Sequence, residues 1–337
     1  MKHGNNFDFL RLFFSFLVVI GHTIILSEQP ELQNNFFAAM PNYSVFCFFI
    51  ISGYLIFSSF ERLANIKQYA FNRAKRILPA YFFVVIFFAF FLFFFSPLSA
   101  ADYFSANWFK YLGANLVFLN FLQPCIDSLF TNQFICAVNG SLWTIKVEIM
   151  FYLFIPFLAF AIRKMRLSHK NVILISLYIL STIYFYFMSK YNYSVLAKQF
   201  PGCLNYFVVG ILLNLNKDFF TKNINILLLP AIITVYLEKA VFMETIFTPF
   251  ALGIAIFWFA YLKIPLKNFG KYGDFSYGMY LIHFPIIQIF VAKGFYKNDP
   301  YIGFLASTVL ILVLAILIWN FIEKPFLTKS ISRKAAQ

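Results

Sequence analysis

Long apolar segments dominate the sequence and leave few folds open to it. Ten of them are candidate membrane spans, at about 7–27, 43–60, 78–96, 141–162, 171–188, 200–215, 224–238, 245–262, 273–293 and 301–322. A hydrocarbon core needs roughly 20 apolar residues from a spanning helix. Of the 337 residues, 61% are hydrophobic and only 12% are charged, and no hydrophilic run is long enough for a soluble domain. The sequence therefore predicts an all-α polytopic membrane protein with one membrane domain over residues 1–337.

The basic residues indicate how the predicted spans are oriented. Lys and Arg concentrate in the loops that lie inside when the N-terminus is placed in the cytoplasm. The net charge of +14 is therefore interpreted as a topology signal, and no nucleic-acid partner is expected. With ten spans, both termini are predicted to be cytoplasmic. Arg11 interrupts the first apolar segment and no small-residue cleavage site follows it, so no cleavable signal peptide is expected.

Two ionisable residues, Arg11 and His22, lie in the first predicted span, eleven residues apart. At ~1.5 Å and ~100° per residue they share one helix face and are separated by roughly 16 Å along the axis. Taken alone, Arg11 could snorkel to the interface and His22 could make a hydrogen bond between helices. Ionisable groups within a membrane are functional candidates by default. A cation and a deeper base on one face suit a long ligand with an anionic end and a reactive end.

Further charged candidates lie in the first inner loop and in the fourth span. Arg73 and Arg76, three residues apart, would face one way on a helix, and guanidinium groups bind phosphate bidentately. They also serve the positive-inside signal. Glu148 lies about two turns into the fourth span, after Ser141 and Trp143, which are further candidate site residues. An unpaired carboxylate there is costly, so we expect a partner on another helix, with His22 as one candidate.

The ninth span contributes Tyr280 and a second buried histidine, His283, which is followed by Pro285. A structural hydrogen bond is the favoured interpretation of His283, and Pro285 favours a kink. The four histidines are spread along the chain, and no metal-ligand spacing is present in the sequence. In the longest outer loop, about 97–140, Cys125 and Cys136 are expected to form a disulfide, because an oxidising exterior would let them pair.

Together these segments resemble the membrane-bound acyltransferase family 3, whose members O-acetylate surface polysaccharides and related acceptors. The resemblance covers nearly the whole chain. Its matching pieces are the spacing of Arg11 and His22, segment 48–55 (Phe-Phe-Ile-Ile-Ser-Gly-Tyr-Leu), Arg73 and Arg76 with Pro79 and Tyr81, segment 139–144 (Asn-Gly-Ser-Leu-Trp-Thr) with Glu148, segment 276–278 (Ser-Tyr-Gly) leading to His283, and segment 323–325 (Glu-Lys-Pro). Each piece alone is modest, but six in this order are a specific signal.

The resemblance implies roles for these residues. Acyl-CoA, usually acetyl-CoA, would be the cytoplasmic donor substrate, with no bound cofactor, and Arg11, Arg73 and Arg76 would hold its phosphates. His22 would be the catalytic base and Glu148 would orient or assist it. The expected partners are membrane lipid and a carbohydrate or lipid-linked glycan acceptor, at a bacterial cytoplasmic membrane. Many members add an extracytoplasmic hydrolase-like domain; here direct transfer or a separate extracytoplasmic partner protein stays open.

Two other classes compete with an acyltransferase. A transporter or flippase for a lipid-linked sugar would suit ten spans and intramembrane titratable groups, but the sequence has no internal repeat and no matching pair of broken helices. A glycosyltransferase that uses a lipid-phosphate sugar has only Glu28 and Glu31 as acidic residues in the first outer loop. The sequence identifies neither the acceptor nor the acyl chain.

Overall fold

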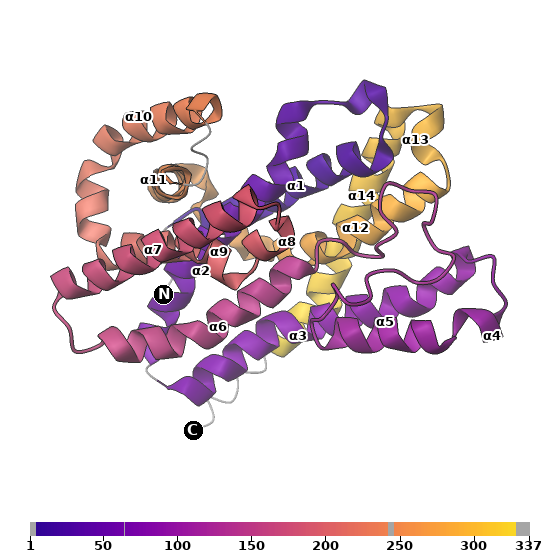
Figure 1. The fold of residues 1–337 in the computed structure, drawn as a ribbon, viewed down its shortest axis with the longest axis horizontal. Helices are drawn as coiled ribbons and strands as arrows, with labels where there is room; N and C mark the ends of the chain where they lie inside the picture. The colour runs from indigo at the N-terminus through magenta and orange to yellow at the C-terminus, as the bar shows by residue number, and fades with distance from the viewer. Residues whose placement is uncertain (1–4, 64, 242–245, 328–337) are drawn as a thin grey trace. The chain divides into compact units, whose positions relative to one another are not determined.

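The computed structural model describes residues 5–63, 65–241 and 246–327, and these contain helices and no β-strand (Figure 1). The ten longest helices are α1 Phe7–Ser27, α2 Asn35–Leu63, α3 Ile66–Phe91, α6 Trp143–Ile162, α7 Leu167–Lys190, α9 Phe200–Leu215, α10 Lys217–Val241, α11 Thr248–Tyr261, α12 Ser276–Ala292 and α14 Pro300–Ile318. Every predicted span falls on one of them. The prediction of an all-α polytopic membrane protein is confirmed.

Seven stretches of the described chain are long and apolar enough to cross a membrane: Phe7–Ser27, Asn35–Leu63, Ile66–Phe95, Trp143–Ile162, Leu167–Lys190, Ser194–Leu215 and Pro300–Leu327. The predicted eighth and ninth spans correspond to α11 and α12, which are apolar but have 14 and 17 residues. The predicted seventh span lies in the more polar α10. Ten crossings therefore stay a prediction, as does the cytoplasmic side of the two termini, which lie outside the described residues.

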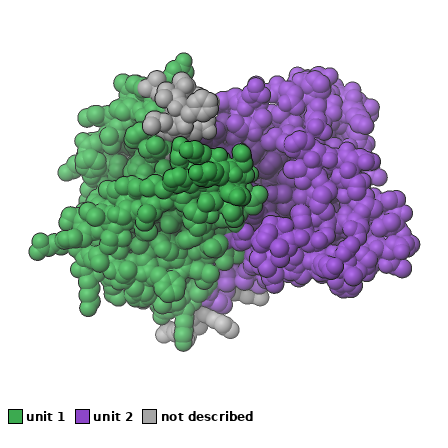
Figure 2. Space-filling model, viewed as in Figure 1, with its two compact units in different colours: residues 1–11, 45–70, 147–271 green, residues 12–44, 71–146, 272–337 purple. Residues whose placement is uncertain are grey.

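The chain forms two compact units, each assembled from three separated segments (Figure 2). Unit 1 contains Met1–Arg11, Val45–Ala70 and Val147–Lys271, and unit 2 contains Leu12–Ser44, Phe71–Lys146 and Tyr272–Gln337. Neither unit is a continuous stretch of sequence, because the chain passes between them several times. The single membrane domain over residues 1–337 stays a prediction.

Within unit 1, α2 and α9 cross closely at two glycines. A Cβ atom added to Gly53 would lie 2.0 Å from the backbone oxygen of Phe207, and one added to Gly210 would lie 2.1 Å from that of Ile50. Small residues let membrane helices bring their backbones together, and van der Waals packing then holds them. Gly53 belongs to the segment 48–55 that the sequence singled out, and its role here is packing.

Within unit 2, the long loop before α6 folds against α3. α4 (Ala100–Tyr103) and α5 (Ala106–Leu116) both reach one carbonyl: the Tyr103 hydroxyl and the Trp108 indole N–H each donate to the backbone oxygen of Ala89 at 2.9 Å. Cys125 and Cys136 form a disulfide, the pairing favoured from the sequence. The outer loop is therefore an ordered structure that α3 and the disulfide hold in place.

Gly210→Ala should destabilise the protein, because its methyl group would meet the Ile50 backbone and force α2 and α9 apart. Overpacking of this kind costs about 1–3 kcal/mol. Thermal unfolding of the detergent-purified protein measures the effect as a lower melting temperature. Gly113→Ala in α5 is the matched control, because a Cβ atom there meets nothing within 4 Å. Equal melting temperatures for Gly210→Ala and the wild type would contradict the packing argument.

Candidate active site

Two hydrogen bonds join α1 to α12 within unit 2. The Ser15 hydroxyl donates to the backbone oxygen of Ser276 at 2.9 Å, and Nδ1 of His22 lies 2.8 Å from Nε2 of His283. The two contacts are seven residues apart on each helix, which is about two turns. The helices therefore run parallel and present matching faces to each other. Parallel first and ninth spans agree with the polarity predicted from the basic residues.

The histidine pair, His22 and His283, is the chemical centre of this contact. The two rings stack with centroids 5.0 Å apart and planes inclined by 12°. His283 is completely buried, whereas His22 is half-buried. Nδ1 of His283 also lies 2.7 Å from the backbone oxygen of Tyr280, an acceptor only. His283 is thus held in place by the Tyr280 carbonyl, whereas His22 is partly accessible.

The carbonyl of Tyr280 determines the proton positions in the neutral pair. Since a carbonyl cannot donate, Nδ1 of His283 carries the proton and donates it to Tyr280, which leaves Nε2 of His283 as an acceptor. Nδ1 of His22 must then donate to that nitrogen. Nε2 of His22 is left unprotonated, with its lone pair directed away from the pair. This is the tautomer that a general base requires.

A proline on α12 explains a second contact. Pro285 has no N–H, so the carbonyl of Leu281 four residues earlier loses its helical partner. The Asn139 side-chain amide donates to that carbonyl at 2.7 Å. In a membrane interior no water is available to bond to this carbonyl. Pro285 therefore leaves the Leu281 oxygen in need of a donor, and Asn139 supplies it. The sequence signal was present in Pro285, but the donor could not be named from the sequence.

Ser141 and Tyr280, two predicted candidate residues, lie in the same contact. The Ser141 hydroxyl donates to the side-chain oxygen of Asn139 at 2.7 Å, and the Tyr280 hydroxyl lies 2.7 Å from that of Thr144. A Cβ atom on Gly140 would lie 2.7 Å from the Phe284 ring, so only glycine allows this approach. Segments 139–144 and 276–285 therefore pack as one unit that holds α12 and His283 in place.

Arg76, predicted to bind phosphate, lies in a cluster of charges in unit 2. It pairs with Asp274 at 2.5 Å and with Glu323 at 3.2 Å, and Glu323 is only 2% exposed. Glu323 belongs to a π-helical turn, Trp319–Glu323, that continues α14. π-Helical turns are frequent at functional sites. Arg76 thus joins α3 to the start of α12 and the end of α14, which ties up part of its five donors.

Two further predicted residues, Arg11 and Glu148, belong to unit 1. Arg11 forms an ion pair with Asp8 one turn earlier in α1. Glu148 is half-buried and accepts a hydrogen bond of 2.5 Å from the Tyr152 hydroxyl one turn later in α6. In unit 2, Trp143 is the first residue of α6, and Arg73 lies on α3 three residues before Arg76. The sequence offered His22 as one candidate partner of Glu148, and the structure shows His283 at Nδ1 of His22.

Residues 5–320 match the family described as "Acyltransferase domain". The chain therefore belongs to this acyltransferase family, as its sequence motifs indicated, and is a membrane acyltransferase rather than a flippase or a glycosyltransferase. It is 28% identical over 354 residues to the protein named O-acetyl transferase of Shigella phage Sf6, covering 98% of both chains. It is 25% identical over 350 residues to Nodulation protein 10 of Rhizobium leguminosarum bv. viciae, covering 96% of this chain and 93% of that protein. No solved structure matches significantly.

Asn139→Ala should destabilise unit 2, because the Leu281 carbonyl is left buried without its donor. An unsatisfied buried acceptor costs about 1–3 kcal/mol. Pro285→Ala restores a backbone N–H, so in the Asn139→Ala/Pro285→Ala double variant the helix itself can satisfy the carbonyl.

A double-mutant cycle on melting temperatures measures this coupling. The double variant should recover much of the loss caused by Asn139→Ala. Asn107→Ala, which removes an exposed amide that bonds to Asp127, is the control and should have little effect. Strictly additive losses at the two positions would show that the amide does not compensate for the proline.

Proposed function

We propose that this protein transfers an acetyl group from acetyl-CoA on the cytoplasmic side to a hydroxyl of a carbohydrate or lipid-linked glycan at the outer face of a bacterial cytoplasmic membrane. The observation that carries the proposal is the histidine pair, in which Nε2 of His22 is free to accept a proton. The similarity to an O-acetyl transferase along 98% of both chains supports acetyl as the group transferred.

The chemistry requires few groups, because a thioester is already activated. Nε2 of His22 removes the proton from the acceptor hydroxyl as its oxygen attacks the thioester carbonyl carbon. The tetrahedral intermediate then collapses, the C–S bond breaks, and CoA leaves as a thiol after taking the proton back from His22. The products are the O-acetyl ester and CoA, and the imidazole returns to its neutral form.

His283 is a positioning residue in this mechanism. It holds the His22 ring through Nδ1, selects its tautomer and accepts the hydrogen bond that a developing imidazolium strengthens. The hydroxyls of Ser141 and Thr144 donate to Asn139 and to the Ser141 carbonyl, which argues against either as an acyl-carrying nucleophile. Direct attack by the acceptor is the route that we propose.

Arginines on the predicted cytoplasmic side would bind the CoA phosphates. Arg73 precedes Arg76 by three residues on α3, and Arg11 lies about one turn inside the start of α1, with Asp8 beside it. Arg76 is shared with Asp274 and Glu323, so we assign it chiefly to holding α12 and α14 in place. Arg73 and Arg11 are the phosphate contacts that we propose, and Glu148 stays a proposed assisting carboxylate.

His22→Ala should abolish transfer of label from radiolabelled acetyl-CoA to cell envelope material, because the base is lost; general bases contribute about 10²–10⁴-fold. His283→Leu should lower kcat roughly 10–100-fold, the size of effect seen when the hydrogen-bond partner of a metal-bound histidine is removed. His283→Gln keeps a hydrogen-bond acceptor near Nδ1 of His22 and should retain more activity than His283→Leu.

The pH dependence of kcat distinguishes a role of His283 in positioning His22 from a folding defect of the His283→Leu variant. If His283 holds the ring of His22, His283→Leu should shift the pH at which activity rises, whereas a folding defect lowers activity at all pH values alike. Near wild-type transfer by a folded His22→Ala variant would overturn the proposed mechanism.

Arg73→Ala should raise the KM for acetyl-CoA with little change in kcat, because a phosphate contact far from the thioester binds ground state and transition state equally. The loss of a charged hydrogen bond is worth about 1.5–3 kcal/mol, which is roughly a 10–100-fold change. Lys75→Ala is the matched control in the same basic segment; its ammonium group lies 4.1 Å from the centre of the Phe71 ring. Equal KM values for both variants would remove Arg73 from the donor site.

A further inference from the structure

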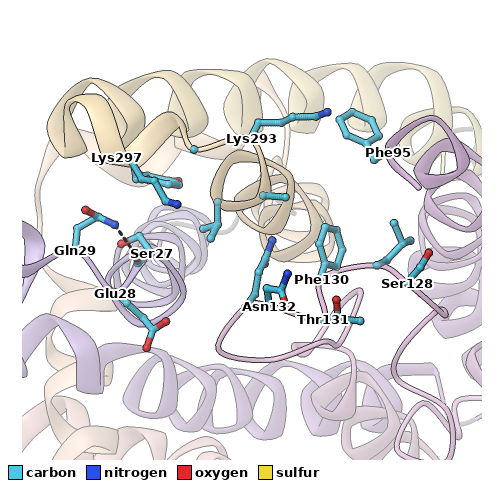
Figure 3. Close-up of a pocket in the computed structure, with 16 residues that line it drawn as sticks. Ser27, Glu28, Gln29, Phe95, Ser128, Phe130, Thr131, Asn132, Lys293 and Lys297 are labelled. Atoms are coloured by element: carbon cyan, nitrogen blue, oxygen red, sulfur yellow. Dashed lines mark hydrogen bonds between the residues drawn. The ribbon is translucent and has the colours of Figure 1, made fainter. Parts of the chain in front are cut away.

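Unit 2 contains a polar cavity of about 540 Å³ beyond the histidine pair (Figure 3). Four parts of the chain form it: the end of α1, Phe95 in the turn that follows α3, the loop after α5, and the turn from α12 into α13 (Phe295–Asn298). Binding pockets for small ligands typically have volumes of about 300–1,000 Å³. The cavity therefore has room for one or two sugar residues.

The loop that forms one wall is held firmly. Its lining residues 128–133 lie inside the loop closed by the disulfide between Cys125 and Cys136. The side chain of Gln288, on α12, donates to the backbone oxygens of Ile135 and Ala137 at 2.6 and 2.9 Å. The disulfide and these bonds give the cavity a preformed wall, and a disulfide is expected on the oxidising outer side.

The backbone of the lining is strained. Five described residues other than glycine have positive φ, and three of them line the cavity: Glu28 at 52°, Ser128 at 64° and Phe130 at 57°. Side chains other than glycine are strained in this conformation, and such strain clusters at ligand sites. In addition, the buried hydroxyl of Ser27 has no hydrogen-bond partner among the described residues. A bound ligand would satisfy it.

The side chains that face the cavity suit an acidic sugar. In Figure 3, Lys297 lies near Ser27 and Gln29, while Lys293 reaches towards Phe95. Both lysines are exposed, and neither is within salt-bridge distance of a carboxylate in the described part of the chain. Lys293 lies 5.1 Å from the centre of the Phe95 ring. Two cations without counterions point to an anionic ligand group.

The other lining groups suit hydroxyls and the apolar face of a sugar ring. Glu28 and Gln29 can accept from hydroxyl groups, Asn132 and Thr131 can donate and accept, and Phe130 supplies an aromatic face. Figure 3 shows Phe130 and Asn132 on the loop opposite the helix end that carries the lysines. A small phosphate or carboxylate ion would not need the amide, hydroxyl and aromatic groups, and a neutral sugar would not need the two lysines.

The cavity also lies where an acceptor must arrive. Ser27 follows His22 by five residues on α1, about 7.5 Å along the axis. Val291 follows His283 by eight residues on α12, about 12 Å. Both helices of the parallel pair therefore lead from the histidine pair to this cavity, in the direction that the predicted topology assigns to the outer face.

We propose that this cavity is the acceptor site and that it holds an acidic glycan, with Lys293 and Lys297 binding its anionic group, a carboxylate or a phosphate. The proposal rests on the proposed function and names its acceptor class. Glu28 and the amides orient the sugar so that one hydroxyl reaches His22.

The test uses the full chain in nanodiscs, radiolabelled acetyl-CoA, and cell envelope material from the producing bacterium as the acceptor. The half-saturating acceptor concentration is measured for the wild type and for Lys293→Ala/Lys297→Ala. We expect it to rise at least tenfold in the double variant while the KM for acetyl-CoA is unchanged. Lys293→Arg/Lys297→Arg should keep it near the wild-type value, and Lys110→Ala, on α5 and outside the cavity lining, should leave it unaltered.

Modified acceptors identify the anion. Envelope material is either carboxyl-reduced or dephosphorylated, and the treatment that raises the wild-type value to that of the double variant names the group. An unchanged half-saturating acceptor concentration in the double variant overturns the assignment of this cavity as the acceptor site. If neither treatment changes that concentration for the wild type, the proposal of an acidic acceptor is overturned. A wild type that transfers no label contradicts the proposed function itself, so the two failures are distinguishable.

Discussion

The parallel contact between α1 and α12 is the interaction on which the candidate site depends. Its two hydrogen bonds, from Ser15 to Ser276 and between His22 and His283, lie two turns apart on both helices. In a membrane interior, no water competes for such groups and an unpaired one is costly. The contact therefore holds the helices in one register, and that register brings the two imidazole rings together.

A second layer of contacts keeps this register from slipping. Pro285 removes a backbone donor, Asn139 replaces it, and Ser141 and Tyr280 hold the segment that carries Asn139. Farther along α12, Gln288 holds the disulfide-closed loop. One helix thus carries the partner of the proposed base, the contact to the 139–144 segment and a wall of the proposed acceptor cavity. Displacing α12 would disturb all three together.

The sequence predicted much of the fold because burial in lipid imposes a simple rule on composition. Each predicted span lies on a helix, and the disulfide between Cys125 and Cys136 is present. The partners of the site residues were less predictable. Glu148 was expected to orient or assist His22, and that role stays a prediction, while the sequence did not show that His283 lies at Nδ1 of His22. Phosphate binding by Arg76 also stays a prediction, and the sequence did not show that Arg76 pairs with Asp274 and Glu323. Spacing along one chain places residues on a helix face, whereas it does not say which helices meet.

The sequence by itself determined the membrane class, the positions of the long helices and the family. These follow from hydropathy, helical periodicity and motif spacing, which are local properties. Only the tertiary structure decided that α12 lies beside α1, that Tyr280 sets the tautomer of the histidine pair, and that a polar cavity opens beyond it. The contact between His22 and His283 and the cavity lining join residues more than a hundred positions apart, and only packing brings such groups together.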